Sequence, residues 1–145
     1  MYSYKYPRAS ITVDAVIFQK ITNKILLIRR GIDPYAGKWA LPGGFVEENE
    51  LLSVACKREL KEETGLSIKH LRQLKAYDKI DRDPRGRTIS IAFYGFTDEE
   101  NSQVKGGDDA AFAKWFPINL LPSLAFDHDL IIRDFILLIK QSLKN

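Results

Sequence analysis

The sequence predicts an α+β fold in which a mixed β-sheet lies between helices. Two observations carry this prediction: segments rich in strand-forming residues come in blocks, and two segments with helical spacing interrupt and follow these blocks. The size of the chain is a third observation. It has 145 residues, of which 45% are apolar, and this is enough for one domain with a sizeable core. Residues 1–145 are therefore expected to form a single domain.

The first predicted elements are two strands that form a hairpin. Apolar residues alternate with other residues over 11–17, and a short apolar run covers 25–28. Thr22 and Asn23 lie between the two segments and are typical of a turn. A loop over 31–44 follows, because this segment contains several glycines and prolines.

The next predicted element is a helix over residues 51–64. Asn49 is its expected N-terminal cap, because an asparagine side chain can accept a hydrogen bond from a free backbone amide at a helix start. Gly65 is expected to end the helix, because glycine readily adopts the left-handed conformation found there.

The second half of the chain contains three extended segments and a final helix. Two strands are predicted over roughly 71–80 and 88–96, and the second is especially rich in β-forming residues. A polar loop over 97–109 leads to a short strand around Trp115. Apolar residues recur at helical spacing over about 127–143, which predicts the last helix.

The composition argues against several classes of protein. No apolar stretch is long enough to cross a bilayer, and the N-terminus lacks an apolar signal core, so a cytoplasmic protein without a membrane partner is expected. The single cysteine, Cys56, cannot form an internal disulfide, and one cysteine with two histidines disfavours a structural zinc site. The net charge of +3 is spread along the chain, and the densest basic segment, 82–87, contains Asp83. No nucleic-acid partner is therefore expected.

The predicted helix over 51–64 has an unusual distribution of charge. On a helical wheel of about 100° per residue, one broad arc is apolar, and it contains Leu51, Leu52, Ala55, Cys56 and Leu60. The opposite, solvent-facing side contains Lys57, Lys61, Ser53 and Thr64. Three glutamates fall within the apolar arc instead, and they are Glu59, Glu62 and Glu63.

Such a cluster of carboxylates needs compensation, because the groups repel one another and are costly to bury unpaired. Arg58 can offer a bidentate guanidinium, and divalent cations can be shared among the oxygens. The alternative is a partly exposed helix end with surface ion pairs. The glycine-containing loop before the helix favours the first interpretation.

That loop contributes further residues to the pattern. Gly43 and Gly44 let the backbone approach the acidic site closely and expose its carbonyl groups. Glu50 lies near the helix start, where the helix dipole favours an anion, and it is a candidate brace for Arg58. The complete pattern is Gly44, five residues, Glu50, seven residues and then Arg58-Glu59-Leu60-Lys61-Glu62-Glu63-Thr64-Gly65-Leu66.

This pattern resembles the Nudix box of the Nudix hydrolases, with every defined position filled. The resemblance implies the Nudix fold, an α/β/α sandwich, and hydrolysis of the pyrophosphate bond of a nucleoside diphosphate derivative. It implies Glu59, Glu62 and Glu63 as ligands of Mg²⁺, for which Mn²⁺ can substitute, with the Gly43 carbonyl as a further ligand. By the same resemblance Arg58 orients the carboxylates, and Glu50 is a structural residue or a minor ligand.

The resemblance leaves two candidates for the general base that activates water. In some Nudix branches the base is a box glutamate, which here is Glu59. In others it is an acidic residue from a loop outside the box, and the loop over 106–109 offers Asp109. The alternative for this loop is a solvated turn, because Gly-Gly-Asp-Asp is typical of turns.

Three segments outside the box, 30–42, 81–87 and 124–128, resemble the ADP-ribose pyrophosphatase branch of the family. The resemblance implies hydrolysis of ADP-ribose to AMP and ribose 5-phosphate. Its small-molecule partner is thus a nucleotide.

Four residues of these segments are candidates for substrate binding. Arg30 or Arg85 can meet the diphosphate or the terminal ribose, and Phe126 or Tyr35 can stack on adenine. The alternatives are arginines in a solvated loop and aromatic residues that belong to the core.

Two alternative functions are compatible with the Nudix family. One is the same chemistry on an oxidised nucleoside triphosphate, a dinucleoside polyphosphate or NADH. The other is a non-catalytic module that senses ADP-ribose, because related domains occur in transcriptional regulators. A sensor is expected to carry a damaged box and an attached DNA-binding domain, whereas this box is intact and the last helix is predicted to end at about Leu143.

The oligomeric state has two open interpretations. Related enzymes are commonly homodimers, and the aromatic N-terminus with Tyr2, Tyr4 and Tyr6 is suited to packing on a partner. The same segment is equally compatible with a frayed end.

Overall fold

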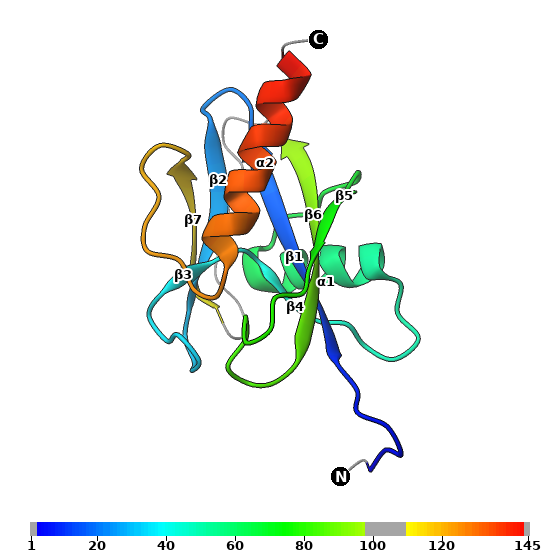
Figure 1. The fold of residues 1–145 in the computed structure, drawn as a ribbon. Helices are drawn as coiled ribbons and strands as arrows, with labels where there is room; N and C mark the ends of the chain where they lie inside the picture. Colours follow the sequence, from blue (N-terminus) through cyan, green and yellow to red (C-terminus); the bar gives the residue numbers. More distant parts are fainter. Residues whose placement is uncertain (1–2, 98–109, 144–145) are drawn as a thin grey trace.

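A mixed β-sheet forms the centre of the computed structural model, which describes residues 3–97 and 110–143 (Figure 1). The strands are β1 (Ser10–Gln19), β2 (Lys24–Arg30), β3 (Trp39–Ala40), β4 (Gly43–Phe45), β5 (Arg72–Tyr77), β6 (Thr88–Thr97) and β7 (Ala110–Pro117). Their order is β3-β2-β1-β6-β5, with β4 also paired to β1 and β7 also paired to β2. β1 runs parallel to β6 and antiparallel to β2 and β4, so the sheet is mixed as predicted.

The predicted hairpin is confirmed. β1 and β2 pair antiparallel, with Phe18 opposite Ile25 and Gln19 opposite Lys24. Asn23 in the connection has a φ of 55°, a left-handed conformation that asparagine tolerates better than most residues do.

Helix α1 (Leu52–Thr64) covers one face of the sheet. Side chains alternate along a strand, so every second residue of β1 points toward this helix. The buried cluster between them contains Val13, Ala15, Ile17, Leu26, Ala55, Cys56, Leu60 and Phe93. Because Cys56 is buried in this cluster, its thiol pKa is raised.

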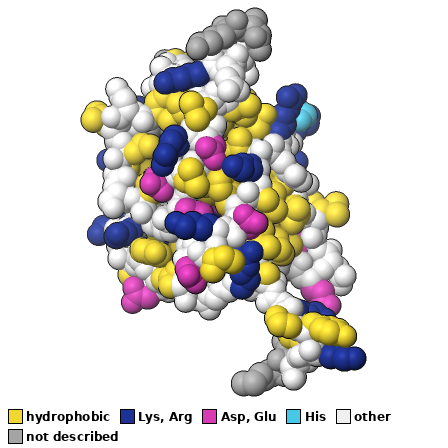
Figure 2. Space-filling view, in the orientation of Figure 1, with side chains coloured by type: hydrophobic (Ala, Val, Ile, Leu, Met, Phe, Trp, Pro, Cys, Tyr) yellow, Lys and Arg dark blue, Asp and Glu magenta, His cyan; other side chains and the backbone are white. Residues whose placement is uncertain are grey.

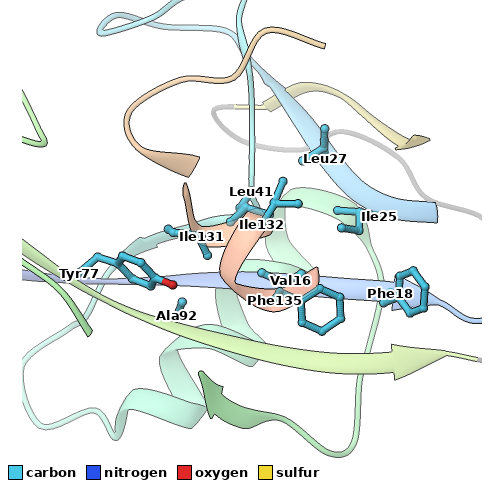
Figure 3. Packing of buried hydrophobic residues seen from close by; sticks show 10 residues of the cluster. All are labelled: Val16, Phe18, Ile25, Leu27, Leu41, Tyr77, Ala92, Ile131, Ile132 and Phe135. Carbon is cyan, nitrogen blue, oxygen red and sulfur yellow. The ribbon is translucent and has the colours of Figure 1, made fainter. Parts of the chain in front are cut away.

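Helix α2 (His128–Leu143) covers the opposite face, so the structure is the α/β/α sandwich that the family resemblance implies (Figure 1). Figure 3 shows the cluster on this side, in which Phe135 and Ile131 of the helix pack over Val16 and Phe18 of β1. The residue that precedes Val16 on this face of β1 is Asp14, which is also buried. A buried carboxylate in such a strand requires a polar partner on the helix side.

The structure corrects three details of the predicted helix. Asn49 is not its cap: the cap position is Leu51, which makes no side-chain capping bond, and Asn49 instead has a left-handed φ of 66°. Leu51 is 73% exposed rather than part of the apolar arc, because it precedes the first helical turn. Thr64 is fully buried, since its hydroxyl donates to the Leu60 carbonyl and accepts from the Leu66 amide. Gly65 does end the helix, with a φ of 78°.

Charged side chains of both signs are interspersed over the face that α2 covers (Figure 2). Lysines and arginines there stand beside aspartates and glutamates, as the spread of charge along the sequence predicts. Within the described ranges, no helix is long and apolar enough to cross a membrane.

Candidate active site

A cavity of about 370 Å³ brings together most of the residues that the sequence singles out. Its lining comes from β1, β2, β4 and α1, from the loop between β5 and β6, and from the start of α2. Glu59, Glu62, Glu63 and Arg58 line it on the α1 side. Arg30, Arg85 and Phe126 line it as well, so one cavity contains both predicted groups.

Arg58 holds the acidic residues of α1 in place. Its Nη1 donates to Oε1 of Glu59 at 2.8 Å and to Oε2 of Glu62 at 3.3 Å. Its Nε donates to Oε2 of Glu50 at 2.7 Å, and its Nη2 donates to Oε1 of the same carboxylate at 2.9 Å. The expected brace between Glu50 and Arg58 is therefore confirmed as a bidentate pair. Hydrogen bonds from Arg58 lower the pKa of Glu50 from its ordinary 4.5 to about 2.

Glu63 is the most buried glutamate of the cavity, at 6% exposure. Its Oε1 accepts a hydrogen bond of 2.7 Å from the amide of Gly43. Burial raises the pKa of Glu63 from 4.5 to about 8, although the Gly43 amide opposes this shift. Glu59 is also affected, because burial raises its pKa while the bond from Arg58 opposes the change.

The two adjacent glycines let the backbone lie against these groups. A Cβ on Gly44 would stand 2.5 Å from the carboxyl carbon of Glu59. A Cβ on Gly43 would stand 2.1 Å from the carbonyl oxygen of Val13 and 2.6 Å from Oδ1 of Asp14. The close approach that the sequence predicts for both positions is thus confirmed, with a side chain facing Gly44 and the backbone of β1 facing Gly43.

The acidic groups have the donor chemistry that a divalent cation needs. Glu59, Glu62 and Glu63 supply carboxylate oxygens to the same cavity. In the described ranges, however, no three Asp, Glu, His or Cys side chains are already arranged around one ion position. Mg²⁺ typically binds one or two carboxylates together with phosphate oxygens and water, so it does not require three converged protein ligands. Burial is the main cause of the raised pKa values of Glu59 and Glu63, and neighbouring carboxylates add to it, so a bound cation would favour the ionised form of both groups.

The predicted substrate-binding residues gather around the ring of Phe126. The guanidinium carbons of Arg30 and Arg85 lie 5.1 and 5.5 Å from the centre of that ring. Tyr35 packs edge-on against it, with ring centres 4.8 Å apart. Phe126 is therefore within cation–π range of both arginines and forms an aromatic part of the cavity lining.

Arg85 also has partners on other sides. It lies 4.7 Å from the ring centre of Phe45 and pairs with Asp83 at 2.7 Å. Burial by itself would raise the pKa of Asp83, but hydrogen bonds from the Arg85 side chain and amide lower it below its ordinary value. The neighbouring Arg82 is nearly buried and forms a bidentate pair with Asp127 at 2.6 and 2.9 Å. This pair fastens the loop between β5 and β6 to the segment before α2.

Asp14 and His128 also line the cavity, and neither is among the predicted site residues, although His128 lies in the segment 124–128 that resembles the ADP-ribose pyrophosphatase branch. Asp14 could have been found, because it is an acidic residue in the middle of a buried apolar strand. His128 gives no such signal, since a histidine at a helix start is unremarkable. Burial lowers the pKa of His128, although Asp14 and Asp127 oppose this shift. The predicted base Asp109 lies outside the described residues.

Comparison with known proteins agrees with this geometry. The NUDIX domain family matches residues 9–138. The ADP-ribose pyrophosphatase of Methanocaldococcus jannaschii is 48% identical over 130 residues, which cover 90% of this chain and 75% of that protein. The ADPR responsive transcriptional repressor NtrR of Acinetobacter baylyi is 34% identical over 137 residues, which cover 90% of this chain. The match spans about half of that repressor, 54% of its length.

A solved structure shows the same likeness in three dimensions. The NUDIX domain of Shewanella oneidensis NrtR, determined in complex with ADP ribose, superposes with a TM-score of 0.86 and 29% identity. The superposition covers 95% of this chain and 94% of that domain. From the matched span, the relatives and the shared fold, we conclude that this chain is a member of the Nudix family of pyrophosphohydrolases.

Proposed function

We propose that this chain hydrolyses ADP-ribose to AMP and ribose 5-phosphate with the help of Mg²⁺ or Mn²⁺. The observation that carries the proposal is that one cavity is lined both by clustered carboxylates and by two arginines. A diphosphate carries the charge that such an arrangement can hold from both sides. The choice of ADP-ribose is supported by the name of the M. jannaschii relative and by the ligand of the S. oneidensis domain.

In this proposal the residues divide the work between binding and reaction. Arg30 and Arg85 bind the diphosphate or the terminal ribose, and Phe126 provides an aromatic surface next to them. Glu59, Glu62 and Glu63 would hold the divalent cation together with the Gly43 carbonyl. When bound, that cation supplies charge neutralisation and lowers the pKa of a coordinated water. Arg58 keeps Glu59 and Glu62 oriented through its two hydrogen bonds.

Glu59 and Asp109 are the two candidates for the general base. Glu59 is favoured by its place in the cavity lining and by the raised pKa that burial gives it, because a base is most effective when its pKa lies near the working pH. Asp109 remains a candidate on the family resemblance alone.

A sensor that binds ADP-ribose without cleaving it is the second candidate, because the A. baylyi relative is a repressor that responds to this ligand. The intact box argues for catalysis. Arg58 contacts Glu50, Glu59 and Glu62, and these contacts support the catalytic role by holding the acidic groups of the box together.

A substrate panel tests the proposal. We expect AMP release from ADP-ribose to exceed the turnover of nucleoside triphosphates, dinucleoside polyphosphates and NADH, and to require Mg²⁺ or Mn²⁺. Initial rates are measured by chromatography of the products, with chelator-treated protein as the control. Faster turnover of another nucleotide in the panel would make that nucleotide the proposed substrate in place of ADP-ribose. Tight binding of ADP-ribose without AMP release would favour the sensor.

The Gly44→Ala variant is expected to lower kcat about 10- to 100-fold while leaving the fold intact. The added Cβ would stand within 2.7 Å of three carboxyl atoms of Glu59, so this carboxylate must move away from its bond to Arg58. The end of a flexible side chain can move at little cost to stability, but a displaced reacting group loses rate steeply. Steady-state kinetics and urea unfolding measure the two effects. A kcat equal to that of the wild type would show that the position of Glu59 does not limit the reaction.

A further inference from the structure

A chain of buried polar contacts connects β6, β1, α2 and α1 beneath the cavity. It begins at Ser90 of β6, whose hydroxyl donates to Oδ2 of Asp14 on β1. Oδ1 of Asp14 lies 3.4 Å from Nε2 of His128, the first residue of α2. Nδ1 of the same ring accepts a hydrogen bond of 2.9 Å from the amide of Leu41. Ser90, Asp14 and His128 are all at least 94% buried.

The contacts fix the tautomer of the histidine. Because Nδ1 accepts from the Leu41 amide, the proton of a neutral ring is on Nε2 and points toward Asp14. The imidazole therefore links a backbone amide on one side to a carboxylate on the other. Both of its nitrogens are used within the protein.

The contacts end at the segment that supports Glu63. Leu41 lies two residues before Gly43, and Asp14 is the register partner of Gly43 in the pairing of β1 with β4. Oδ1 of Asp14 packs so closely on Gly43 that an added Cβ would stand 2.6 Å from it. Gly43 in turn donates its amide to Glu63 at 2.7 Å. Asp14 and His128 thus hold residues 41–43 from two sides.

We infer that Asp14 and His128 are positioning residues, which fix residues 41–43 so that the Gly43 amide holds the carboxylate of Glu63 at the cavity. The inference rests on the proposed function only in taking Glu63 as a metal ligand. Groups that orient a ligand from behind typically change metal affinity or activity about 10- to 100-fold when they are removed. Neither residue needs to touch the substrate for this effect.

The test measures Mn²⁺ binding to the full chain without nucleotide. Electron paramagnetic resonance gives the concentration of the free ion. Asp14→Ala and His128→Phe are expected to weaken Mn²⁺ binding about tenfold. They are also expected to lower kcat about 10- to 100-fold with KM within about threefold. Asp14→Asn keeps an oxygen that can accept from His128, so it should restore most of the affinity. If Asp14→Asn is as damaging as Asp14→Ala, Asp14 acts through its charge and the inference is overturned.

Two further variants separate positioning from a loss of folding. Ser90→Ala removes one buried hydroxyl that lies outside the cavity lining, and we expect it to weaken Mn²⁺ binding about threefold through Asp14. Tyr77→Phe is the matched control, because it removes a hydrogen bond of 2.8 Å to Asp134 on α2, away from the cavity. It should leave Mn²⁺ affinity unchanged. Equal Mn²⁺ affinities in the wild type, Asp14→Ala and His128→Phe would overturn the inference.

The two proposals can fail separately. Mn²⁺ binding requires no substrate. If the wild-type protein binds Mn²⁺ but releases no AMP from ADP-ribose, the proposed hydrolysis of ADP-ribose is contradicted. The order of Mn²⁺ affinities among the variants would still decide the roles of Asp14 and His128.

Discussion

Glu63→Gln is expected to lower kcat by at least about 100-fold at saturating Mg²⁺. Glutamine keeps the shape of the side chain, and its carbonyl oxygen can still accept the hydrogen bond from Gly43. The negative charge is lost, however, and with it the strongest attraction that this position offers to a divalent cation. Stabilisation by a metal ion is worth several kcal/mol in the transition state, and about 1.4 kcal/mol corresponds to a factor of ten in rate.

The measurement is steady-state AMP release over a range of Mg²⁺ concentrations. Glu48→Gln is a suitable control, because it makes the same chemical change at an exposed glutamate that does not line the cavity. The control should retain the wild-type rate. Near-full activity of Glu63→Gln would mean that Glu63 is not a metal ligand.

The second large effect concerns stability without metal, which we expect to decrease as the pH rises from about 5 to 8. Burial raises the native pKa of Glu63 to about 8, whereas its ordinary value, which applies to the unfolded chain, is 4.5. Between these values the native state holds a proton that the unfolded state has lost. The free energy of unfolding therefore falls with increasing pH over this interval. At about 1.4 kcal/mol per pH unit, the largest change attributable to this group is on the order of 4 kcal/mol.

Urea unfolding of the wild type and Glu63→Gln in the presence of a chelator isolates this contribution. Glutamine does not titrate, so the wild type should lose stability from pH 5 to pH 8 through this group and the variant should not. The free energy of unfolding of the variant should therefore rise relative to that of the wild type over this interval. Mg²⁺ should stabilise the wild type more at pH 8 than at pH 6, because only the ionised carboxylate binds it well. If the free energies of unfolding of the two proteins change with pH in parallel, the raised native pKa of Glu63 is contradicted.

The same substitution is thus expected to stabilise the metal-free protein and to inactivate the enzyme. Such a trade-off between stability and activity is common at sites where function requires a buried charge. It follows here from the geometry, since Glu63 is 94% buried and its carboxylate accepts a hydrogen bond from an uncharged amide, that of Gly43.

Much of the fold could be predicted from local patterns. The hairpin of β1 and β2, the helix that ends at Gly65 and the final helix all depend on residues near one another in the sequence. The box itself lies within 23 residues, so the pairing of Arg58 with Glu50 and Glu59 could also be anticipated. Arg58 and Glu59 are neighbours on α1 and Glu50 lies two residues before the helix, so a long arginine side chain can reach both carboxylates over a short stretch of chain.

The errors are local as well, and each has a physical cause. A helical wheel assigns Thr64 to the solvent side, but the chain reverses at Gly65 and Thr64 satisfies its hydroxyl within the last turn, where it is buried. Leu51 precedes the first turn, so its side chain does not follow the wheel. Asn49 adopts a left-handed conformation that is incompatible with the extended geometry of a cap.

By itself the sequence determined the family, the acidic helix and the type of bond that the family cleaves, because the residues of the box are neighbours along one helix and its preceding loop. Only the tertiary structure decided which distant residues complete the cavity. Asp14 and His128 are 114 positions apart in the chain, yet they come within 3.4 Å because α2 packs on the face of the sheet that contains Asp14. Such contacts depend on how helices and strands pack, and no spacing in the sequence encodes them.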